Sequence, residues 1–447
     1  MAQRPNLLLL FPDQWRGDWL GCAGGGIPVS TPQIDALASR GIRFAEARTN
    51  SPLCSTARAC LATGQRYPAA GVASNQEDLP TDAPSFFRLL QDAGYAVATC
   101  GKNDLRKAAF IAGAPDAGER LAAYGFTEVR EHAGKRDAAV LMIQQRPDRY
   151  GRFLAGHNAI DGYLRDMATR DMLRQNQHAV SGAAHLLPRA LYTDDFCGSD
   201  ALALIGALPS DRPWALWVNF PGPHEPFDPP ADLLAPYDGV RFPDPVAPGS
   251  DDRSDHQQVR RAYAAMMTGI DSWVGRILDA VTMRGDAANT LTIFSSDHGE
   301  TLGDHGRWGK SVPYDGALRI PLVMAGPGVR AGIVSPARAE LADIAATLLD
   351  AAGMDEPPDY AARSLLPVAR GTAAADELRS HQYFALGDWR GLVFDQYKAV
   401  RFDDGRVVLY DRDRDPDETT DRAAALPRTA AYLGAWLARY PAPPSGV

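Results

Sequence analysis

The stretch Asn6-Leu-Leu-Leu-Leu-Phe-Pro-Asp-Gln14 decides how the fold is read. Its apolar run, Leu7 to Phe11, has the length of a strand, and such a short continuous run is typical of a strand buried on both faces of a parallel sheet. Pro12 ends the run, and the polar side chains of Asp13 and Gln14 follow at once. The run is too short for a membrane span or a secretion signal, so we interpret it as the first core strand.

Further along the chain, similar short apolar runs alternate with segments of helical period. We expect strands at 7–11, 96–100, 214–220, 290–294 and 322–325, and helices at 32–40, 55–63, 85–93, 194–208, 257–283 and 341–349. This alternation predicts an α/β fold around a central, mainly parallel sheet. Residues 113–191 lack a clear period, and we interpret them as an insertion that shapes a substrate pocket.

The C-terminal part has a different pattern. Proline and glycine residues between positions 354 and 371 indicate a boundary. Beyond it we expect strands at 381–386, 391–394, 397–402 and 407–410 and a helix at 429–440. The chain is therefore predicted to have a catalytic domain, 1–370, and a small C-terminal α+β domain, 371–447, in which an antiparallel sheet is closed by the helix.

Composition narrows the function. The 447 residues are 45% hydrophobic and 23% charged, which is typical of a globular protein. The 46 Lys and Arg against 55 Asp and Glu give a net charge of −9, which argues against a nucleic-acid partner. Five cysteines are too few for a disulfide framework and favour a reducing cytoplasm, or the periplasm if a leader has been removed. The lack of a long apolar run argues against a membrane span.

Polar and charged residues follow several of the expected strands. In a parallel sheet the carboxyl ends of the strands share one edge, where ligand sites gather. A histidine stands out because the prolines in the loop Pro-Gly-Pro-His-Glu-Pro hold it rigidly. Taken singly, each of these residues has an ordinary explanation, such as a helix cap, a loop hydrogen bond or a solvated lysine. The candidates are Asp13, Gln14, Lys102, His224, Asp297, His298 and Lys310.

A cysteine motif changes this assessment. The stretch Asn50-Ser-Pro-Leu-Cys54-Ser-Thr-Ala-Arg58 places a cysteine at the start of an expected helix, with an arginine four residues later. It resembles the signature of the type I, formylglycine-dependent sulfatases of the alkaline phosphatase superfamily. Further segments resemble that family in the same order along the chain. They are residues 8–14, 31–44, 296–310, 319–323 and 409–418.

The resemblance implies an alkaline-phosphatase-like α/β sandwich with a small C-terminal antiparallel domain, and the hydrolysis of a small-molecule sulfate ester. It implies that a maturation enzyme oxidises Cys54 to formylglycine, whose hydrate is a geminal diol. One hydroxyl would attack sulfur, and loss of a proton from the other would release sulfate. Cys60, in the same helix, is expected to be a core residue.

The resemblance also implies a set of site residues. One divalent ion, Ca²⁺ first and Mn²⁺ second, would be bound by Asp13, Gln14, Asp297, His298 and residue 54. Cations suit the charge that spreads over the sulfate oxygens, and Arg58, Lys102 and Lys310 would surround them. His224 would protonate the leaving oxygen.

The chain departs from the family pattern at two places, and alternatives stay open. Thr56 stands where relatives have Pro or Ala, and Asn103-Asp104 replaces a common Trp-His pair, which makes these two residues candidates for substrate contact. One alternative is a phosphonate monoester or phosphodiester hydrolase, because such enzymes share the Gln14 and His298 type of ligand set. The other is a catalytically silent binding protein with an unmodified Cys54. The organic part of the substrate and the oligomeric state stay open.

Overall fold

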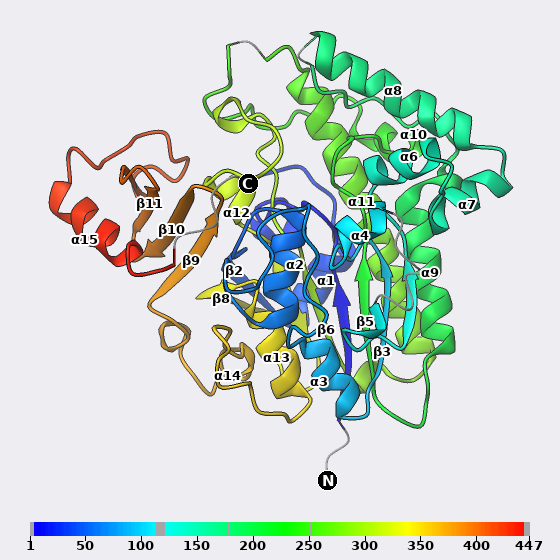
Figure 1. Ribbon diagram of the computed structural model, residues 1–447, viewed down its shortest axis with the longest axis horizontal. Coiled ribbons are helices and arrows are strands. Elements are labelled where there is room, and N and C mark those ends of the chain that lie inside the picture. The colour runs from blue at the N-terminus through cyan, green and yellow to red at the C-terminus, as the bar shows by residue number, and fades with distance from the viewer. Residues whose placement is uncertain (1–3, 113–120, 178, 251, 442–447) are drawn as a thin grey trace.

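The computed structural model describes residues 4–112, 121–177, 179–250 and 252–441. One large sheet runs through its body, and a smaller sheet lies at one end (Figure 1). The strands of the large sheet are β1 (Asn6–Leu10), β2 (Ile42–Arg48), β3 (Ala96–Gly101), β4 (Glu128–Glu131), β5 (Trp214–Asn219), β6 (Thr290–Ser295), β7 (Leu322–Ala325) and β8 (Ile333–Glu340). Their order is β4-β3-β5-β1-β6-β7-β2-β8. Among these strands only β7 runs against its neighbours, which confirms the mainly parallel sheet.

Helices cover both faces of this sheet. Along β1, Leu7 and Leu9 belong to one hydrophobic cluster, and Leu8 and Leu10 belong to the other. Such alternation is expected of a strand buried on both sides. The first cluster includes α2 (Cys54–Thr63), α3 (Phe86–Asp92) and α13 (Asp343–Ala351), and the second includes α1 (Pro32–Ser39), α9 (Thr193–Ala207) and α11 (His256–Met283). The predicted layered α/β architecture is therefore confirmed.

Three strands, β2, β4 and β8, were not expected from the sequence. The last residues of β2 and β8 are charged and meet distant parts of the chain rather than the apolar core. Arg48 donates to Gln382 Oε1 at 2.7 Å, and Glu340 lies 2.9 Å from Arg379 Nη1. Because these partners are far away in the sequence, local apolar periodicity does not reveal the strands.

The insertion is more regular than its sequence indicates. Residues 113–120 lie outside the described residues. The rest contains β4, α6 (Lys135–Ile143), α7 (Arg149–Gly156) and α8 (Ile160–Gln177) around a small apolar cluster that includes Tyr150, Leu154 and Tyr163. Shorter helices are α4 (Lys107–Ala112), α10 (Ala231–Leu234), α12 (Asp315–Leu318) and α14 (Leu366–Arg370). Single 3-10 turns lie at Gly21–Ala23, Arg189–Leu191, Ala235–Tyr237, Ala287–Asn289, Asp304–Gly306 and Ala375–Glu377.

The C-terminal part forms the expected antiparallel sheet and helix. The strands are β9 (His381–Leu386), β10 (Trp389–Phe394), β11 (Tyr397–Phe402) and β12 (Val407–Asp411), in the order β12-β11-β10-β9, and the helix is α15 (Pro427–Leu437). Its apolar residues join the same cluster as α2 and α13. Ala385 N also donates to Asn50 O at 3.0 Å, just before the Cys54 helix. The boundary at residue 370 stays a prediction.

All five cysteines are free thiols, and four of them are buried. Cys60 is completely buried in the core, and burial raises the pKa of its thiol, which suits a structural residue. Within the described ranges, no helix is both long and apolar enough to cross a bilayer.

Candidate active site

The sheet brings the predicted residues to one edge. Strands β3, β5, β1 and β6 are neighbours and parallel, so their carboxyl ends lie together. Lys102 follows β3, Asp13 follows β1, and Asp297 follows β6. His224 lies in the loop after β5, which contacts the Asp13 segment through a hydrogen bond from Asp13 N to Gly222 O at 3.1 Å. Helix α2 begins at Cys54 beside this edge.

A network of buried charges surrounds this point. Arg58 Nη2 lies 3.1 Å from Asp13 Oδ2, and Arg58 Nε lies 3.1 Å from Asp297 Oδ2. Lys102 Nζ donates to the same oxygen of Asp13. All four side chains are at most 3% exposed, so solvent screens these contacts weakly. Arg58 stands one helical turn after Cys54, which places both residues on the same helix face.

Cys54 lies at the centre of the network. Its Sγ is 3.3 Å from His298 Nε2, 3.5 Å from Lys102 Nζ and 3.8 Å from Asp13 Oδ1. Burial and Asp13 raise the pKa of the thiol, but Lys102, Lys310 and His298 outweigh them and lower it to about 5. The surroundings therefore stabilise negative charge on the side chain at position 54.

The two carboxylates differ in their ionisation. Burial disfavours the charged form of Asp13, but Lys102 and Arg58 hold its pKa well below the usual range. Burial and the neighbouring Asp13 raise the pKa of Asp297. The cations present therefore neutralise Asp13 better than Asp297, and a further cation near both would stabilise the pair.

The side chains around Cys54 fit a divalent ion. The ligand atoms of Asp13, Cys54, Asp297 and His298 all lie within 4.8 Å of one another, and all four residues are buried. His298 Nδ1 is 3.0 Å from Gly299 O, to which it donates, so Nε2 faces the cluster. Burial lowers the pKa of His298, but Asp297 outweighs it and raises that pKa, and loss of the Nε2 proton would free a lone pair for an ion. Carboxylate oxygens are the ligands that Ca²⁺ prefers, and an imidazole also suits Mn²⁺.

Gln14 lies next to this cluster in a strained conformation. Its φ of 67° falls in the left-handed region, which is uncommon for a residue with a side chain. This conformation lets Gln14 N donate to Asp297 Oδ1 at 2.9 Å. The side-chain amide accepts from Lys310 Nζ at 2.6 Å and donates to Glu300. The structure thus brings Gln14 into the site, while its role as a metal ligand stays a prediction.

His224 and Lys310 form a hydrogen-bonded pair. His224 Nδ1 is 2.7 Å from Glu225 O, to which it donates, so Nε2 accepts from Lys310 Nζ. Burial and the charge of Lys310 lower the pKa of His224 well below its usual value. The imidazole is therefore neutral in the free site, with Nε2 as the acceptor of the hydrogen bond.

Two residues of the site were not predicted from the sequence. Asn219 ends β5, where its Oδ1 accepts from Arg58 Nη1 at 2.8 Å. Glu300 accepts from the Gln14 amide and from Leu302 N. Two features of the sequence could have indicated these residues. Asn219 is an amide at the end of an otherwise apolar strand, and Glu300 is an acid three residues after Asp297.

The two residues that replace the Trp-His pair are both buried. Asn103 Nδ2 has no hydrogen-bond partner in the part of the chain that the structure describes. Asp104 lies 3.3 Å from Lys102 Nζ and 3.6 Å from Lys107 Nζ. Asp104 therefore helps to hold Lys102, whereas Asn103 keeps an unused donor beside the site.

A second acidic cluster does not fit a metal ion. Asp166, His185 and Asp228 also have ligand atoms within 4.8 Å of one another. However, Arg170 pairs with Asp166 at 2.9 Å, and Lys135 pairs with Asp228 at 2.5 Å. His185 Nδ1 accepts from the backbone N–H of Leu187 at 3.0 Å, so the proton of the ring is on Nε2, which faces the acids. We interpret this cluster as a structural connection between the insertion and the His224 loop.

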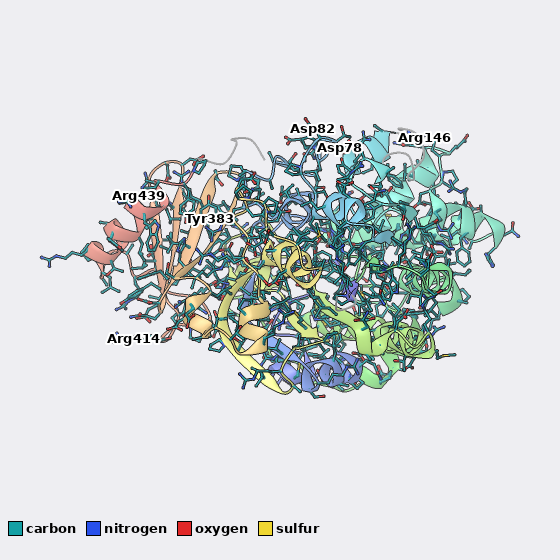
Figure 2. All side chains as sticks on the ribbon, turned by 90° about the horizontal axis from the view of Figure 1, so that it is seen from below. Asp78, Asp82, Arg146, Tyr383, Arg414 and Arg439 are labelled. Atoms are coloured by element: carbon teal, nitrogen blue, oxygen red, sulfur yellow. The ribbon has the colours of Figure 1, made fainter. Side chains whose placement is uncertain are left out.

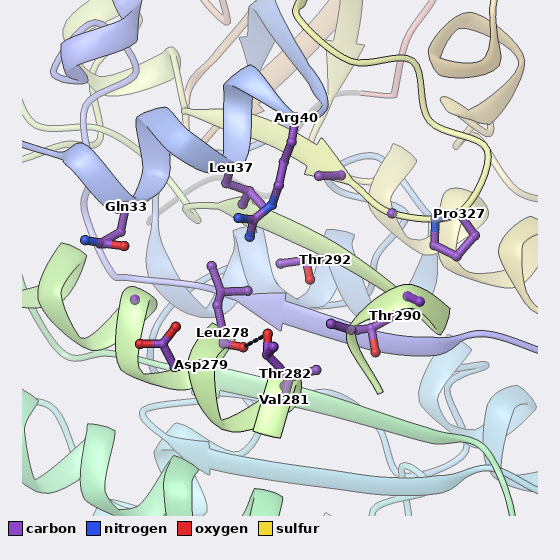
Figure 3. A pocket seen from close by; sticks show the side chains of 15 residues that line it. Gln33, Leu37, Arg40, Leu278, Asp279, Val281, Thr282, Thr290, Thr292 and Pro327 are labelled. Atoms are coloured by element: carbon purple, nitrogen blue, oxygen red, sulfur yellow. Dashed lines mark hydrogen bonds between the residues drawn. The ribbon is translucent and has the colours of Figure 1, made fainter. Parts of the chain in front are cut away.

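A cavity of about 520 Å³ lies elsewhere, between α1, α11 and the start of β6 (Figure 3). Thr290, on its wall, begins β6, whereas Asp297 follows the other end of that strand. The cavity is therefore separate from the charged edge. Its lining includes Gln33, Arg40, Asp279 and Thr282 and offers one charge of each sign near its mouth.

This chain is similar to known proteins in both sequence and structure. The family model described as Sulfatase matches residues 5–354, and one described as N-sulphoglucosamine sulphohydrolase, C-terminal, matches residues 303–426. An arylsulfatase of Clostridium perfringens is 26% identical, over 94% of this chain and 90% of that protein. A choline-sulfatase of Rhizobium meliloti is 28% identical, over 94% and 82%. The solved phosphonate monoester hydrolase from Silicibacter pomeroyi superposes with a TM-score of 0.80 at 23% identity, over 97% of this chain and 94% of that one.

Proposed function

Because the chain belongs to the sulfatase family and is a sulfuric ester hydrolase, we propose that it cleaves its ester with a formylglycine formed from Cys54 and with one divalent ion. The observation that supports this most is the position of Cys54 Sγ, between 3.3 and 3.8 Å from His298, Lys102 and Asp13. One hydroxyl of the hydrated aldehyde would attack sulfur, and loss of a proton from the other would break the bond to the sulfated oxygen, which releases sulfate and restores the aldehyde. A separate maturation enzyme would carry out the oxidation.

We propose that the ion is bound by Asp13, Asp297, His298, residue 54 and Gln14. Calcium is the first candidate because oxygen ligands predominate, and manganese is the second because of the imidazole. The ion would lower the pKa of the attacking hydroxyl and neutralise sulfate oxygens. Support comes from the two carboxylates, which converge from separate strand ends with Asp297 the less well neutralised of the two.

Arg58 and Lys102 have different roles in this proposal. Arg58 is fully occupied by Asp13, Asp297 and Asn219, so it orients the two carboxylates. Lys102 Nζ lies 3.5 Å from Cys54 Sγ and would stabilise negative charge on the nucleophile and on the sulfate oxygens. Burial opposes the charge of Lys102, but Asp104 and Asp13 raise its pKa well above the usual value, so this cation is present at neutral pH.

Protonation of the leaving oxygen is assigned to the pair of His224 and Lys310. His224 Nε2 faces the ammonium group of Lys310, so a proton passed to Nε2 can continue to the departing oxygen. The hydrogen bond from Nδ1 to Glu225 O fixes the orientation of the ring. Lys310 also contacts Gln14, which places the pair beside the proposed ion ligands.

The proposal is tested with a series of esters that share one alcohol and differ in the acid group. Purified enzyme is assayed with the sulfate, phosphate and phosphonate esters of that alcohol, and the proposal expects the highest kcat/KM for the sulfate. A higher kcat/KM for the phosphonate would favour the phosphonate hydrolase alternative. No turnover of any ester, with a wholly unmodified Cys54, would favour the binding protein. A cytoplasmic location is part of the proposal, because the five cysteines are free.

A further inference from the structure

A second cationic pocket lies at the other end of helix α2. Its volume is about 290 Å³, and we call it the arginine pocket. Its polar lining residues are Arg66, Tyr360, Arg363, Arg379, Ser380 and His381. Helix α2 has 10 residues and begins at Cys54, so about 15 Å of helix separates this pocket from the nucleophile. Tyr383, labelled in Figure 2, lies beside it on β9, with the guanidinium of Arg66 5.9 Å from its ring centre.

The arginine pocket contains buried donors without acceptors. Arg379 is only 4% exposed, yet its Nε has no hydrogen-bond partner among the described residues. The hydroxyl oxygen of Tyr360 is also buried and likewise lacks a partner there. An unpaired buried donor costs about 1–3 kcal/mol, so such groups are rare unless an acceptor occupies the space beside them.

The arginines of the pocket are not all ion-paired. Arg66 donates to both oxygens of Glu340, at 2.8 and 2.7 Å. Arg379 pairs with Glu340 at 2.9 Å and with Asp343. Arg363 donates to Leu378 O at 2.6 Å, and within the described ranges it has no carboxylate partner. Two of the three guanidinium groups are therefore ion-paired, and that of Arg363 is not. Glu356 and Asp359 lie near Tyr360 but form no ion pair with these arginines in the described structure.

The neighbouring imidazole adds no charge to the pocket. Burial and the charge of Arg66 lower the pKa of His381 to about 4, so the ring is neutral at pH 7. Its Nε2 is 2.5 Å from the Tyr440 hydroxyl, and its Nδ1 is 3.1 Å from the Ser380 hydroxyl. The unpaired charge is thus that of the Arg363 guanidinium, and guanidinium groups bind tetrahedral oxyanions through paired N–H groups.

We propose that the arginine pocket binds a tetrahedral oxyanion, a sulfate or phosphate group, as a site separate from the active site. At about 30 Å³ for each water molecule, the pocket holds roughly ten waters, which leaves room beside a single oxyanion for a small organic carrier. The larger cavity of Figure 3 carries no such inference, because its lining offers a single arginine, Arg40, and includes no buried donor without a partner.

Crystals soaked in millimolar sodium selenate test the proposal, because selenium gives an anomalous signal. We expect a selenium peak in the arginine pocket of the wild-type enzyme. The peak should weaken about tenfold in Arg363→Gln, which loses a charge-assisted hydrogen bond. The matched control is Arg406→Gln, an exposed arginine on another face, which should keep the peak. Tyr360→Phe removes only a hydroxyl without a partner, so it should fold normally and also weaken the peak.

Competition identifies the source of the anion. Addition of sulfate or phosphate should displace selenate from the pocket, and the more effective of the two is the natural ligand class. Displacement by chloride at the same ionic strength would overturn the proposal, as would an empty pocket in the wild type or an equal peak in Arg363→Gln. Turnover of an activated aryl sulfate by Arg363→Gln should equal that of the wild type, because the pocket lies a helix length from Cys54.

Discussion

Two of the buried charge clusters in the described part of the chain are built differently. The catalytic cluster contains Asp13, Arg58, Lys102, Asp297 and His298 around Cys54. The interface cluster, under the C-terminal sheet, contains Arg48, Asp315, Lys398 and Glu418. In the interface cluster Asp315 lies 2.6 Å from Arg48 and 3.1 Å from Lys398. Glu418 also pairs with Lys398, and it accepts a hydrogen bond from Asp315 N at 2.9 Å. Each carboxylate there is met by a cation and a second partner.

The difference shows what distinguishes a reactive site from a structural one. Burial raises the pKa of Asp315, but Arg48 and Lys398 outweigh it and hold that pKa well below the usual range. A raised carboxyl pKa does not separate the two clusters, because burial raises the pKa of Glu418 as well as that of Asp297. What separates them is that four ligand atoms lie within 4.8 Å of one another in the catalytic cluster. Buried charge alone therefore does not indicate a function, whereas convergent ligand atoms around a nucleophile do.

The largest effect is expected from Asp297→Ala. Removing one carboxylate from the convergent set should release the divalent ion and lower kcat by roughly a thousandfold or more. Elemental analysis of the purified protein measures the ion, and steady-state kinetics measures turnover. Asp166→Asn is the matched control because its cluster is already neutralised by Arg170 and should keep the ion. Full activity of Asp297→Ala without metal would contradict the assignment.

A graded effect is expected from His224→Ala. Loss of the proton donor should slow alkyl or sugar sulfates by roughly a hundredfold to ten-thousandfold and spare activated aryl sulfates, whose leaving groups need no proton. Lys310→Ala should also lower the rate on aryl sulfates if that lysine binds sulfate oxygens common to every substrate. Equal losses on both substrate classes in His224→Ala would assign the acid role to Lys310 or Lys102.

The smallest effect on turnover is expected from Lys398→Met in the interface cluster. Asp315 keeps its pair with Arg48, but the buried Glu418 loses its cation, which should lower the free energy of unfolding by about 3–5 kcal/mol. Because Lys398 contacts no residue of the catalytic cluster in the described structure, kcat per folded molecule should stay close to the wild-type value. Denaturant unfolding and active-site titration separate the two quantities. A large loss of kcat with an unchanged free energy of unfolding would contradict the assignment of a structural role to the interface cluster.

The same contrast explains how much could be predicted from the sequence. Asp13, Lys102, His224 and Asp297 follow apolar strands, and parallel strands collect their following residues at one edge, so the site could be assembled from local patterns. The hydrogen bond between Arg48 and Gln382 joins residues 334 positions apart. Local periodicity does not reveal such pairs, and for this reason β2, β8 and the interface cluster were missed.

The contacts around Gln14 also could not be predicted from local sequence patterns. Its positive φ, its contact with Lys310 and its contact with Glu300 depend on segments nearly 300 residues away. The resemblance placed Gln14 in the site, but it gave no role to Glu300, which lies in the matching segment 296–310, and it did not include Asn219; these two residues hold Gln14 and Arg58.

The central claim is that Cys54 becomes the nucleophile, and peptide mass spectrometry combined with turnover tests it most directly. Trypsin should release residues 49–58 with Cys54 and residues 59–66 with Cys60, so the neighbouring peptide is an internal control. The account expects the first peptide to lose one sulfur and two hydrogens and to gain one oxygen, in proportion to kcat, while the Cys60 peptide keeps its thiol. Full turnover by a preparation in which Cys54 is wholly an unmodified thiol would contradict the account.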